Sequence, residues 1–198
     1  TLFRSKLSSG DTSQADVLFV EGSTFREMRA KLNGQPELLH ITRDMNDADI
    51  MSRLGMAGQS PEGWFFPDTY RFDKRSEDIA VLQRALAAMQ KQLNTVWRSR
   101  DANLPLKSPY ELLILASIVE KETGTAADRA QIAGVFINRL RKGMRLQTDP
   151  TVIYGLGERF DGNLRKADLQ RDTPHNTYTR TGLPPTPICM PGLAALQA

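Results

Sequence analysis

The stretch "LLILASIVEKETG", residues 112–124, decides the fold, because an apolar run ends there in two carboxylates. Ser108 and Pro109 precede it, and serine at a cap followed by proline in the first turn is typical of a helix start. Glu111 stands three positions after the serine, which strengthens this signal. Glycine often follows the last residue of a helix, so we expect this helix to end near Gly124.

The spacing of the apolar residues distinguishes the two glutamates at the end of this helix. Leu115, Ile118 and Val119 follow helical spacings of three and four, and Glu122 continues their face, whereas Glu120 does not. A carboxyl at the edge of an apolar face is desolvated, which raises its pKa and suits a general acid. We therefore expect Glu122 to be half-buried. On spacing alone, the commoner alternative is an apolar face that ends at Val119 and a Glu122 in solvent.

Cap and turn signals predict a helix-dominated α+β fold. Further helices are expected over 25–33, 47–54, 77–97 and 126–142, the third of them capped by Ser76. Strands are expected in "VLFVEG" (17–22) and "TVIYGLG" (151–157), and residues 1–16 read as a strand fragment with a linker. Pro67 excludes a helix in the aromatic segment 60–72. Residues 173–192, rich in proline, are expected to form a long surface loop.

Composition limits the function classes. The 198 residues are 40% hydrophobic and 25% charged, which is ordinary for a folded soluble domain. The net charge of +3 is scattered, so we predict no nucleic-acid partner. His40, His175 and the single Cys189 are too few for a zinc site, and we predict neither a metal nor a cofactor. The sequence shows no run of about 18 apolar residues, so we expect no membrane span in it, and Thr1–Gly10 does not resemble a signal peptide.

Other carboxylates are candidate partners of a catalytic glutamate. Glu62, Asp68 and Asp149 are the candidates, although each also fits a turn position. Aromatic side chains around them are suited to stacking on sugar rings, but such a cluster is more often core. These residues alone do not decide between a site and a structural role.

Four motifs in order resemble one bacterial family. They are "EGWFFPDTYRF", "LASIVEKET", "VFINRLRKGMRLQTDPTVIYG" and "NTYTRTGLPPTPI", the last followed, after Cys189, by "MPG". Together they are similar to the endolytic murein transglycosylases, the YceG-like proteins, from about Val17 to the end of the chain. His175 stands where many relatives have tyrosine, which puts a sugar contact by this residue in doubt.

The resemblance implies an enzyme and its site. It implies a lytic transglycosylase that cleaves the β-1,4 bond between N-acetylmuramic acid and N-acetylglucosamine in peptidoglycan strands, leaving 1,6-anhydromuramoyl ends and terminating nascent strands. It also implies one catalytic glutamate on a lysozyme-like helix, which falls on Glu122 because a threonine follows it. Substrate-binding residues are expected at Glu62, Asp149, Asn176 and Tyr178. Two alternatives stay open: a hydrolytic muramidase, and a non-catalytic glycan-binding scaffold for a peptidoglycan synthase.

The resemblance also implies an organisation. We expect a small N-terminal α/β subdomain over 1–58, with a remnant of a LysM-like module, and a catalytic domain over 59–198, truncated at its C-terminus. Family members usually carry an N-terminal membrane helix, which this chain lacks. The expected location is therefore the inner membrane, through that missing anchor, with the catalytic region facing the periplasm. Peptidoglycan strands, and a synthase, are the expected partners.

Overall fold

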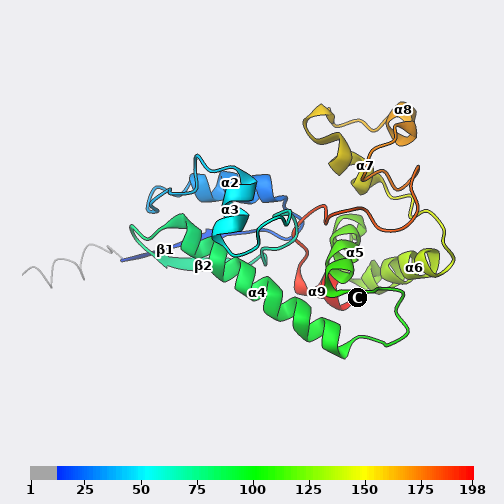
Figure 1. Cartoon of the computed structure of the whole chain (residues 1–198), viewed down its shortest axis with the longest axis horizontal. Coiled ribbons are helices and arrows are strands. Elements are labelled where there is room, and N and C mark those ends of the chain that lie inside the picture. Colours follow the sequence, from blue (N-terminus) through cyan, green and yellow to red (C-terminus); the bar gives the residue numbers. More distant parts are fainter. Residues whose placement is uncertain (1–12) are drawn as a thin grey trace, which may run out of the picture.

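The computed structural model describes residues 13–198 and confirms a helix-dominated α+β fold (Figure 1). Its elements are β1 (Gln14–Leu18), α2 (Phe25–Asn33), α3 (Asp47–Arg53), β2 (Thr69–Asp73), α4 (Asp78–Ser99), α5 (Pro109–Glu122), η1 (Ala126–Asp128), α6 (Arg129–Arg141), α7 (Asp149–Leu156), η2 (Gly157–Arg159), α8 (Lys166–Gln170) and α9 (Leu193–Gln197). The predicted strand fragment and most of the linker in 1–16 lie outside the described residues. No helix within 13–198 is both long and apolar enough to cross a bilayer.

The N-terminal elements form around a two-stranded antiparallel sheet. β1 pairs with β2 in a register that places Val17 opposite Tyr70, and both side chains are buried. The strand expected at 17–22 therefore starts earlier and ends at Leu18. The helices predicted over 25–33 and 47–54 are present as α2 and α3, and the side chains of Thr24 and Asn46 accept backbone N–H bonds at their starts.

Helix α4 links two hydrophobic clusters. Leu82 and Leu86 belong to the first, around the sheet and α2, whereas Met89 and Leu93 belong to the second, around α5. Figure 1 shows α4 running from the sheet to α5 and α9. The helix starts at Asp78 without a side-chain cap, so the predicted cap at Ser76 is wrong. The division into domains at residue 58 stays a prediction.

Helix α5 lies at the centre of the second cluster. It begins as predicted, with Ser108 accepting the Glu111 N–H, but every residue of 112–119 is buried. The helix packs against α4, α6, α7 and α9, so neighbours surround it. A helix that is buried on all sides has no single apolar stripe, so extending such a stripe does not predict whether a residue at the helix end is buried. The polar end of α5 leaves the core at Glu120.

The predicted strand at 151–157 is wrong, because these residues form most of α7. β-Branched residues at 151–153 favour a strand locally. In the structure, Pro150 occupies the first turn of a helix, and Val152 and Leu156, four apart, are both buried. Burial of this helical face outweighs the local preference.

The segment 173–192 has no helix or strand, as predicted, but it is not a surface loop throughout. Its last part is buried from Pro187 to Gly192. The Ile188 N–H donates to the Ser117 hydroxyl over 3.0 Å, and the Met190 N–H donates to the Ser23 carbonyl over 2.8 Å. This segment therefore joins α5 to the N-terminal elements through the interior.

Candidate active site

Glu122 is the last residue of α5 and is exposed. The expectation of a half-buried Glu122 is therefore wrong, because the apolar surroundings of α5 end at Val119. The carboxylate is nevertheless held in place: its Oε1 accepts a hydrogen bond from the hydroxyl of Thr148, whose residue is 2% exposed. The site thus presents an accessible carboxylate on a buried support.

Glu120 has a different environment from Glu122. It is half-buried, and its Oε2 accepts the Gly192 N–H over 2.9 Å. This contact ties the end of α5 to the segment that leads into α9. Glu120 therefore has a structural partner of its own.

Asp149 and Tyr178 lie beside Glu122. The Tyr178 hydroxyl donates to Asp149 Oδ1 over 2.5 Å, joining the start of α7 to the 173–192 segment. Burial, this hydrogen bond and the negative charges of Asp149 and Glu122 raise the pKa of Tyr178 to about 12. The structure thus brings together three residues that the sequence had only placed in separate motifs.

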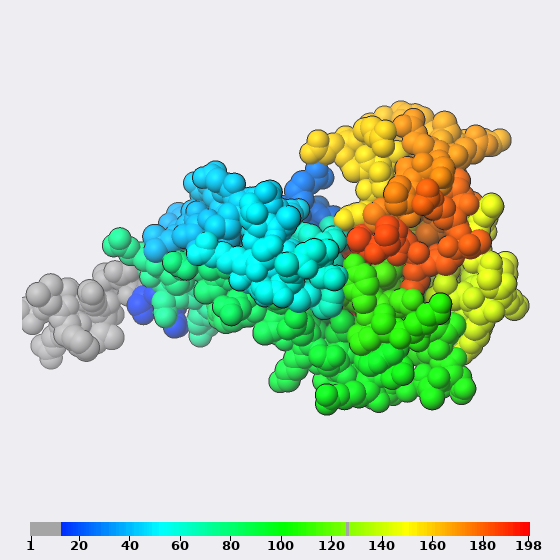
Figure 2. Space-filling view, viewed as in Figure 1, coloured from blue at the N-terminus to red at the C-terminus, as the bar shows by residue number. Residues whose placement is uncertain are grey.

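A cleft of about 1070 Å³ lies between α2 and α7. Figure 2 shows the surface hollowed between the blue segment at α2 and the yellow and orange segments at α7 and α8. Lys121 and Pro150 line the cleft, and they are the chain neighbours of Glu122 and Asp149. Glu122 and Asp149 themselves lie outside the lining of the cleft.

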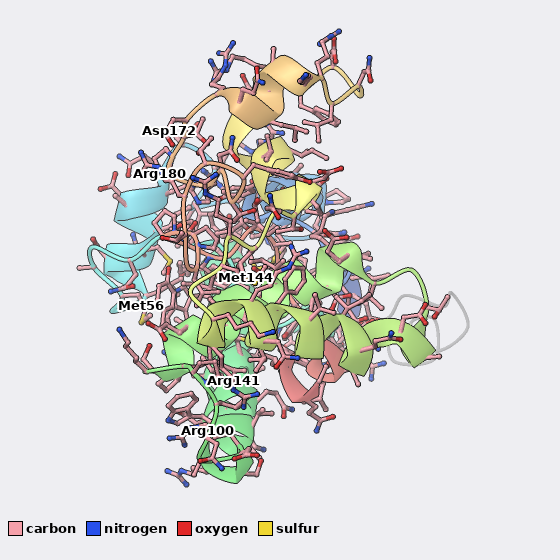
Figure 3. All side chains as sticks on the ribbon, turned by 90° about the vertical axis from the view of Figure 1, so that its right-hand side faces the viewer. Met56, Arg100, Arg141, Met144, Asp172 and Arg180 are labelled. Atoms are coloured by element: carbon pink, nitrogen blue, oxygen red, sulfur yellow. The ribbon has the colours of Figure 1, made fainter. Side chains whose placement is uncertain are left out.

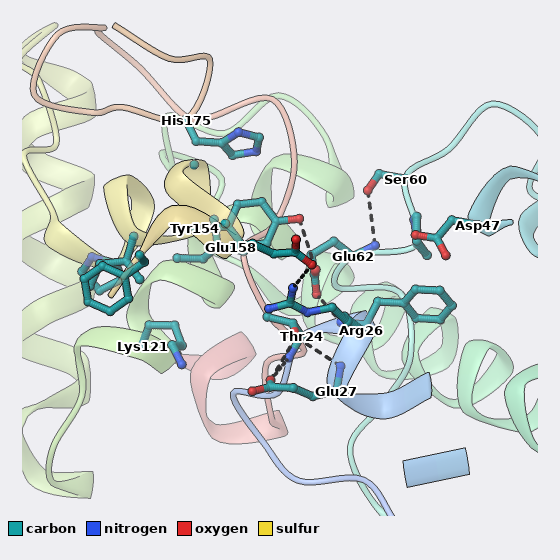
Figure 4. Close-up of a pocket in the computed structure, with 18 residues that line it drawn as sticks. Thr24, Arg26, Glu27, Asp47, Ser60, Glu62, Lys121, Tyr154, Glu158 and His175 are labelled. Carbon is teal, nitrogen blue, oxygen red and sulfur yellow. Dashed lines mark hydrogen bonds and ion pairs between the residues drawn. The ribbon is translucent and has the colours of Figure 1, made fainter. Parts of the chain in front are cut away.

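Glu62 lies in the wall of this cleft and is 5% exposed (Figure 4). Its Oε1 accepts the Phe25 N–H at the start of α2 over 3.0 Å, and its Oε2 accepts the Tyr154 hydroxyl of α7 over 3.1 Å. Burial is the main cause that raises the pKa of Glu62 to about 7. The desolvated carboxyl that the sequence suggested for Glu122 thus exists at Glu62.

His175 also lines the cleft. Its ring packs edge-on against Tyr154, with centroids 4.9 Å apart, and its Nε2 is 2.9 Å from the Thr186 hydroxyl. Burial lowers the pKa of His175, so its neutral form is favoured. These contacts support the tyrosine that in turn holds Glu62.

Asn176 is buried, and its polar atoms are engaged within the chain. Its amide donates to the carbonyls of Leu169 and Arg171 over 3.0 and 2.7 Å, while its Oδ1 accepts the Tyr178 N–H over 2.8 Å. Arg180 and Asp172 close the same turn with a two-point ion pair at 2.8 and 2.9 Å (Figure 3). A sugar contact by Asn176 stays a prediction, and these bonds favour a role in shaping the segment that carries Tyr178.

Thr148 and Tyr154 are the site residues that the sequence reasoning missed. Both lie in or next to α7, which was assigned as a strand. Threonine two residues before Pro150 is a helix-start signal that would have pointed to Thr148. Among the described residues, no group of three histidine, cysteine or acidic side chains is arranged to hold a metal ion.

The fold and the site define an α+β protein with an exposed glutamate held by a buried threonine, and with a cleft lined by the chain neighbours of Glu122 and Asp149. Comparison with known proteins identifies the family: a model of the YceG-like family matches residues 3–198, and the chain belongs to this family. A protein from Bacillus subtilis named endolytic murein transglycosylase is 44% identical over 98% of this chain. The chain spans 58% of that relative's length.

Two further relatives agree with this assignment. A Streptococcus pneumoniae protein with the same name is 36% identical over 69% of this chain and 25% of its own length. The crystal structure of a YceG-like protein from Listeria monocytogenes superimposes with a TM-score of 0.78 at 31% identity, covering 99% of this chain and 70% of that one. The fold described above is therefore shared with a solved member of the family.

Proposed function

We propose that the protein is an endolytic lytic transglycosylase that cleaves the β-1,4 bond between N-acetylmuramic acid and N-acetylglucosamine, leaves 1,6-anhydromuramoyl ends and so terminates nascent glycan strands. The observation that carries the proposal is the accessible Glu122 carboxylate, held by buried Thr148 beside Asp149 and Tyr178. The cleft lined by Lys121 and Pro150, the chain neighbours of Glu122 and Asp149, has room for part of a polysaccharide. The names of the relatives from Bacillus and Streptococcus support the reaction class.

Glu122 acts twice in the proposed mechanism. As the acid, it transfers its proton to the glycosidic oxygen as the bond from that oxygen to the muramoyl anomeric carbon breaks. As the carboxylate, it then takes the proton of the muramoyl 6-hydroxyl, whose oxygen forms a new bond to the same carbon. The acid is regenerated, and no water is consumed. Because the nucleophile belongs to the substrate, its effective concentration is high and one carboxyl is sufficient.

The surroundings of Glu122 suit this single-carboxyl chemistry. A hydrolytic muramidase needs a second carboxylate to act as nucleophile or to activate water. Asp149 is hydrogen-bonded to Tyr178, and Glu62 is buried in a contact with Tyr154. We assign Asp149 and Tyr178 to the binding of sugar hydroxyl and acetamido groups and to stabilisation of the developing positive charge. Glu62 and Asn176 are proposed to act in substrate binding by shaping the walls of the site.

The finer features follow from the same proposal. The catalytic region around α5 is proposed to be lysozyme-like, and the N-terminal elements to be related to a LysM-like module. The proposed location is the bacterial inner membrane, with the site facing the periplasm. A peptidoglycan synthase is the proposed protein partner.

Replacing each of the two glutamates of α5 tests the function. Glu122→Gln keeps the shape of the side chain but removes the acid, so release of anhydromuramoyl fragments from purified glycan strands should fall by roughly 10²–10⁴-fold. Glu120→Gln keeps a carbonyl for the Gly192 N–H and is the matched control, with activity near wild type. Mass spectrometry of the products supplies the measurement.

The same digestion separates the alternatives. Reducing ends without anhydromuramoyl ends would identify a hydrolytic muramidase. Fragment release that is the same in wild type and Glu122→Gln would reject Glu122 as the catalytic group. Binding of strands without any cleavage by the wild type would favour the scaffold.

A further inference from the structure

The Thr148 hydroxyl reaches the exposed Glu122 carboxylate from a buried position. Thr148 is the residue before α7 and is 2% exposed, and its hydroxyl donates to Glu122 Oε1. Glu122 is the last residue of α5, where the chain leaves the helix, so neighbouring turns restrain its side chain little. The contact with Thr148 therefore fixes one of its two oxygens and leaves Oε2 for a ligand.

Two further threonines, Thr151 and Thr177, hold Thr148 itself. The Thr148 N–H donates to the Thr177 hydroxyl over 3.1 Å, and the Thr151 hydroxyl donates to the Thr148 carbonyl over 2.7 Å. The hydroxyls of Thr151 and Thr177 are 2.8 Å apart and hydrogen-bonded to each other. All three residues are at most 2% exposed. The three residues form a buried polar cluster, whose internal bonds orient the group that contacts Glu122.

The turn before Thr148 is also strongly constrained. Gln147 has a backbone φ of 51°, a left-handed conformation that residues other than glycine rarely adopt. Its N–H donates to the Thr177 carbonyl over 3.1 Å, and the Arg139 guanidinium donates to the Leu146 carbonyl. Such a conformation persists where the surrounding structure determines it. The backbone that presents Thr148 is therefore held from α6 and from the 173–192 segment.

We infer that Thr148 is a positioning residue for the catalytic step, an inference that rests on the proposed role of Glu122. A hydroxyl both donates and accepts hydrogen bonds, so Thr148 remains a partner when Glu122 gains or loses its proton. It holds Oε1 in both half-reactions, so Oε2 meets the glycosidic oxygen and then the muramoyl 6-hydroxyl. Thr177 extends this control to the segment that carries Tyr178, the neighbour of Asp149.

Substitutions at Thr148 separate positioning from packing. Thr148→Val keeps the size of the side chain and removes the hydroxyl, so kcat should fall by roughly 10–100-fold, as misplacing a reacting group does, with KM within about twofold. Thr148→Ser keeps the hydroxyl and should restore kcat to within about threefold of wild type. Thr148→Cys has a similar size but is a weak donor, and its kcat should lie between these two.

The experiment uses the protein at its natural length, with kinetics measured on purified glycan strands and thermal unfolding measured for every variant. Thr42→Val is the control for loss of a buried threonine hydroxyl, because the Thr42 hydroxyl donates to Asp78 at the start of α4. It should lower the unfolding temperature without lowering kcat. Glu122→Gln is included to test the proposed function separately.

The outcomes of the two proposals are distinct. An inactive Glu122→Gln together with wild-type kcat in Thr148→Val would overturn the positioning role alone. Equal kcat values for Thr148→Ser and Thr148→Cys would also overturn it, even if the valine variant does not fold. Full activity of Glu122→Gln would overturn the catalytic proposal and, with it, the positioning role.

Discussion

Tyr154 on α7 donates a hydrogen bond to the buried Glu62 carboxylate over 3.1 Å, and the same carboxylate accepts the first N–H of α2. The two elements on either side of the cleft are therefore joined through one ionisable group. The folded-state pKa of Glu62 is about 7, above its ordinary value of 4.5. Protonation and folding are consequently linked at this position.

The first prediction concerns the pH dependence of stability. Because the folded protein holds the Glu62 proton more tightly than the unfolded chain, the contribution of Glu62 to stability falls as pH rises from about 4.5 and levels off above about 7, by at most on the order of 3 kcal/mol. Glu62→Gln is neutral throughout and should lose less stability between pH 5 and pH 8 than wild type. Urea unfolding at the two pH values measures the difference.

Glu27→Gln provides the control for this experiment. The Thr24 backbone N–H lowers the pKa of Glu27, so this carboxyl is ionised above pH 5 in both the folded and unfolded states. The Glu27 charge is a minor contributor to the raised pKa of Glu62, so its replacement should change the difference between pH 5 and pH 8 much less than Glu62→Gln does. An equal pH dependence in wild type and Glu62→Gln would contradict the assignment to Glu62.

The second prediction compares two arginines of α2. Arg29 is largely buried and donates to the carbonyls of Thr42 and Met45 over 3.0 and 2.8 Å, besides its ion pair with Asp47. Arg29→Ala leaves these carbonyls without their donor and should cost about 2 kcal/mol or more. Arg26 pairs with Glu158 in solvent, so Arg26→Ala should cost less than about 1 kcal/mol.

Chemical denaturation of the two alanine variants measures this contrast. Equal losses would mean that the ion pair between Arg26 and Glu158 contributes more than an exposed pair normally does. In that case, the pair would act with Glu62 in holding the two sides of the cleft together.

The helix starts were predictable from sequence because their signals are local. Ser108, Thr24 and Asn46 each accept a backbone N–H within three residues, and no distant part of the chain is needed for such a bond. The environment of Glu122 was not predictable in this way. Burial on all sides of α5 depends on helices that are distant in sequence, and the helical spacing then carries no information about its end.

The strand predicted at 151–157 was wrong for a related reason: a local preference was outweighed by contacts with distant parts of the chain. Its β-branched residues favour an extended conformation locally, but α7 buries Val152 and Leu156 together against neighbouring elements. Because a strand was predicted there, Thr148 was not recognised as a site residue: a threonine at this position is informative only when a helix follows it. The resemblance of the motifs to a family pointed to Glu122, Asp149 and Tyr178, whereas only the structure places them side by side.

The third prediction concerns the close approach at Gly63. A Cβ added there would lie 2.5 Å from Pro187 Cβ, at a backbone φ of +83°. Gly63→Ala should therefore shift the buried 187–192 segment and destabilise the protein by more than the about 1–2 kcal/mol that the left-handed conformation alone costs. Gly55→Ala is the matched control, because its φ is +78° with no atom within 4 Å of an added Cβ. Similar unfolding midpoints for both variants would contradict the packing assigned to Pro187.

The last prediction concerns Tyr178 and the rate of cleavage. Its pKa of about 12 keeps the hydroxyl protonated, so it donates to Asp149 throughout the range from pH 5 to pH 9. Tyr178→Phe removes one charge-assisted hydrogen bond, so it should lower kcat by roughly tenfold. The factor should be the same at every pH in this range. Tyr110→Phe is the control, because the Tyr110 ring stacks on Trp64 in the second cluster. A change in the shape of the pH–rate profile in Tyr178→Phe would show instead that the tyrosine exchanges a proton during the reaction.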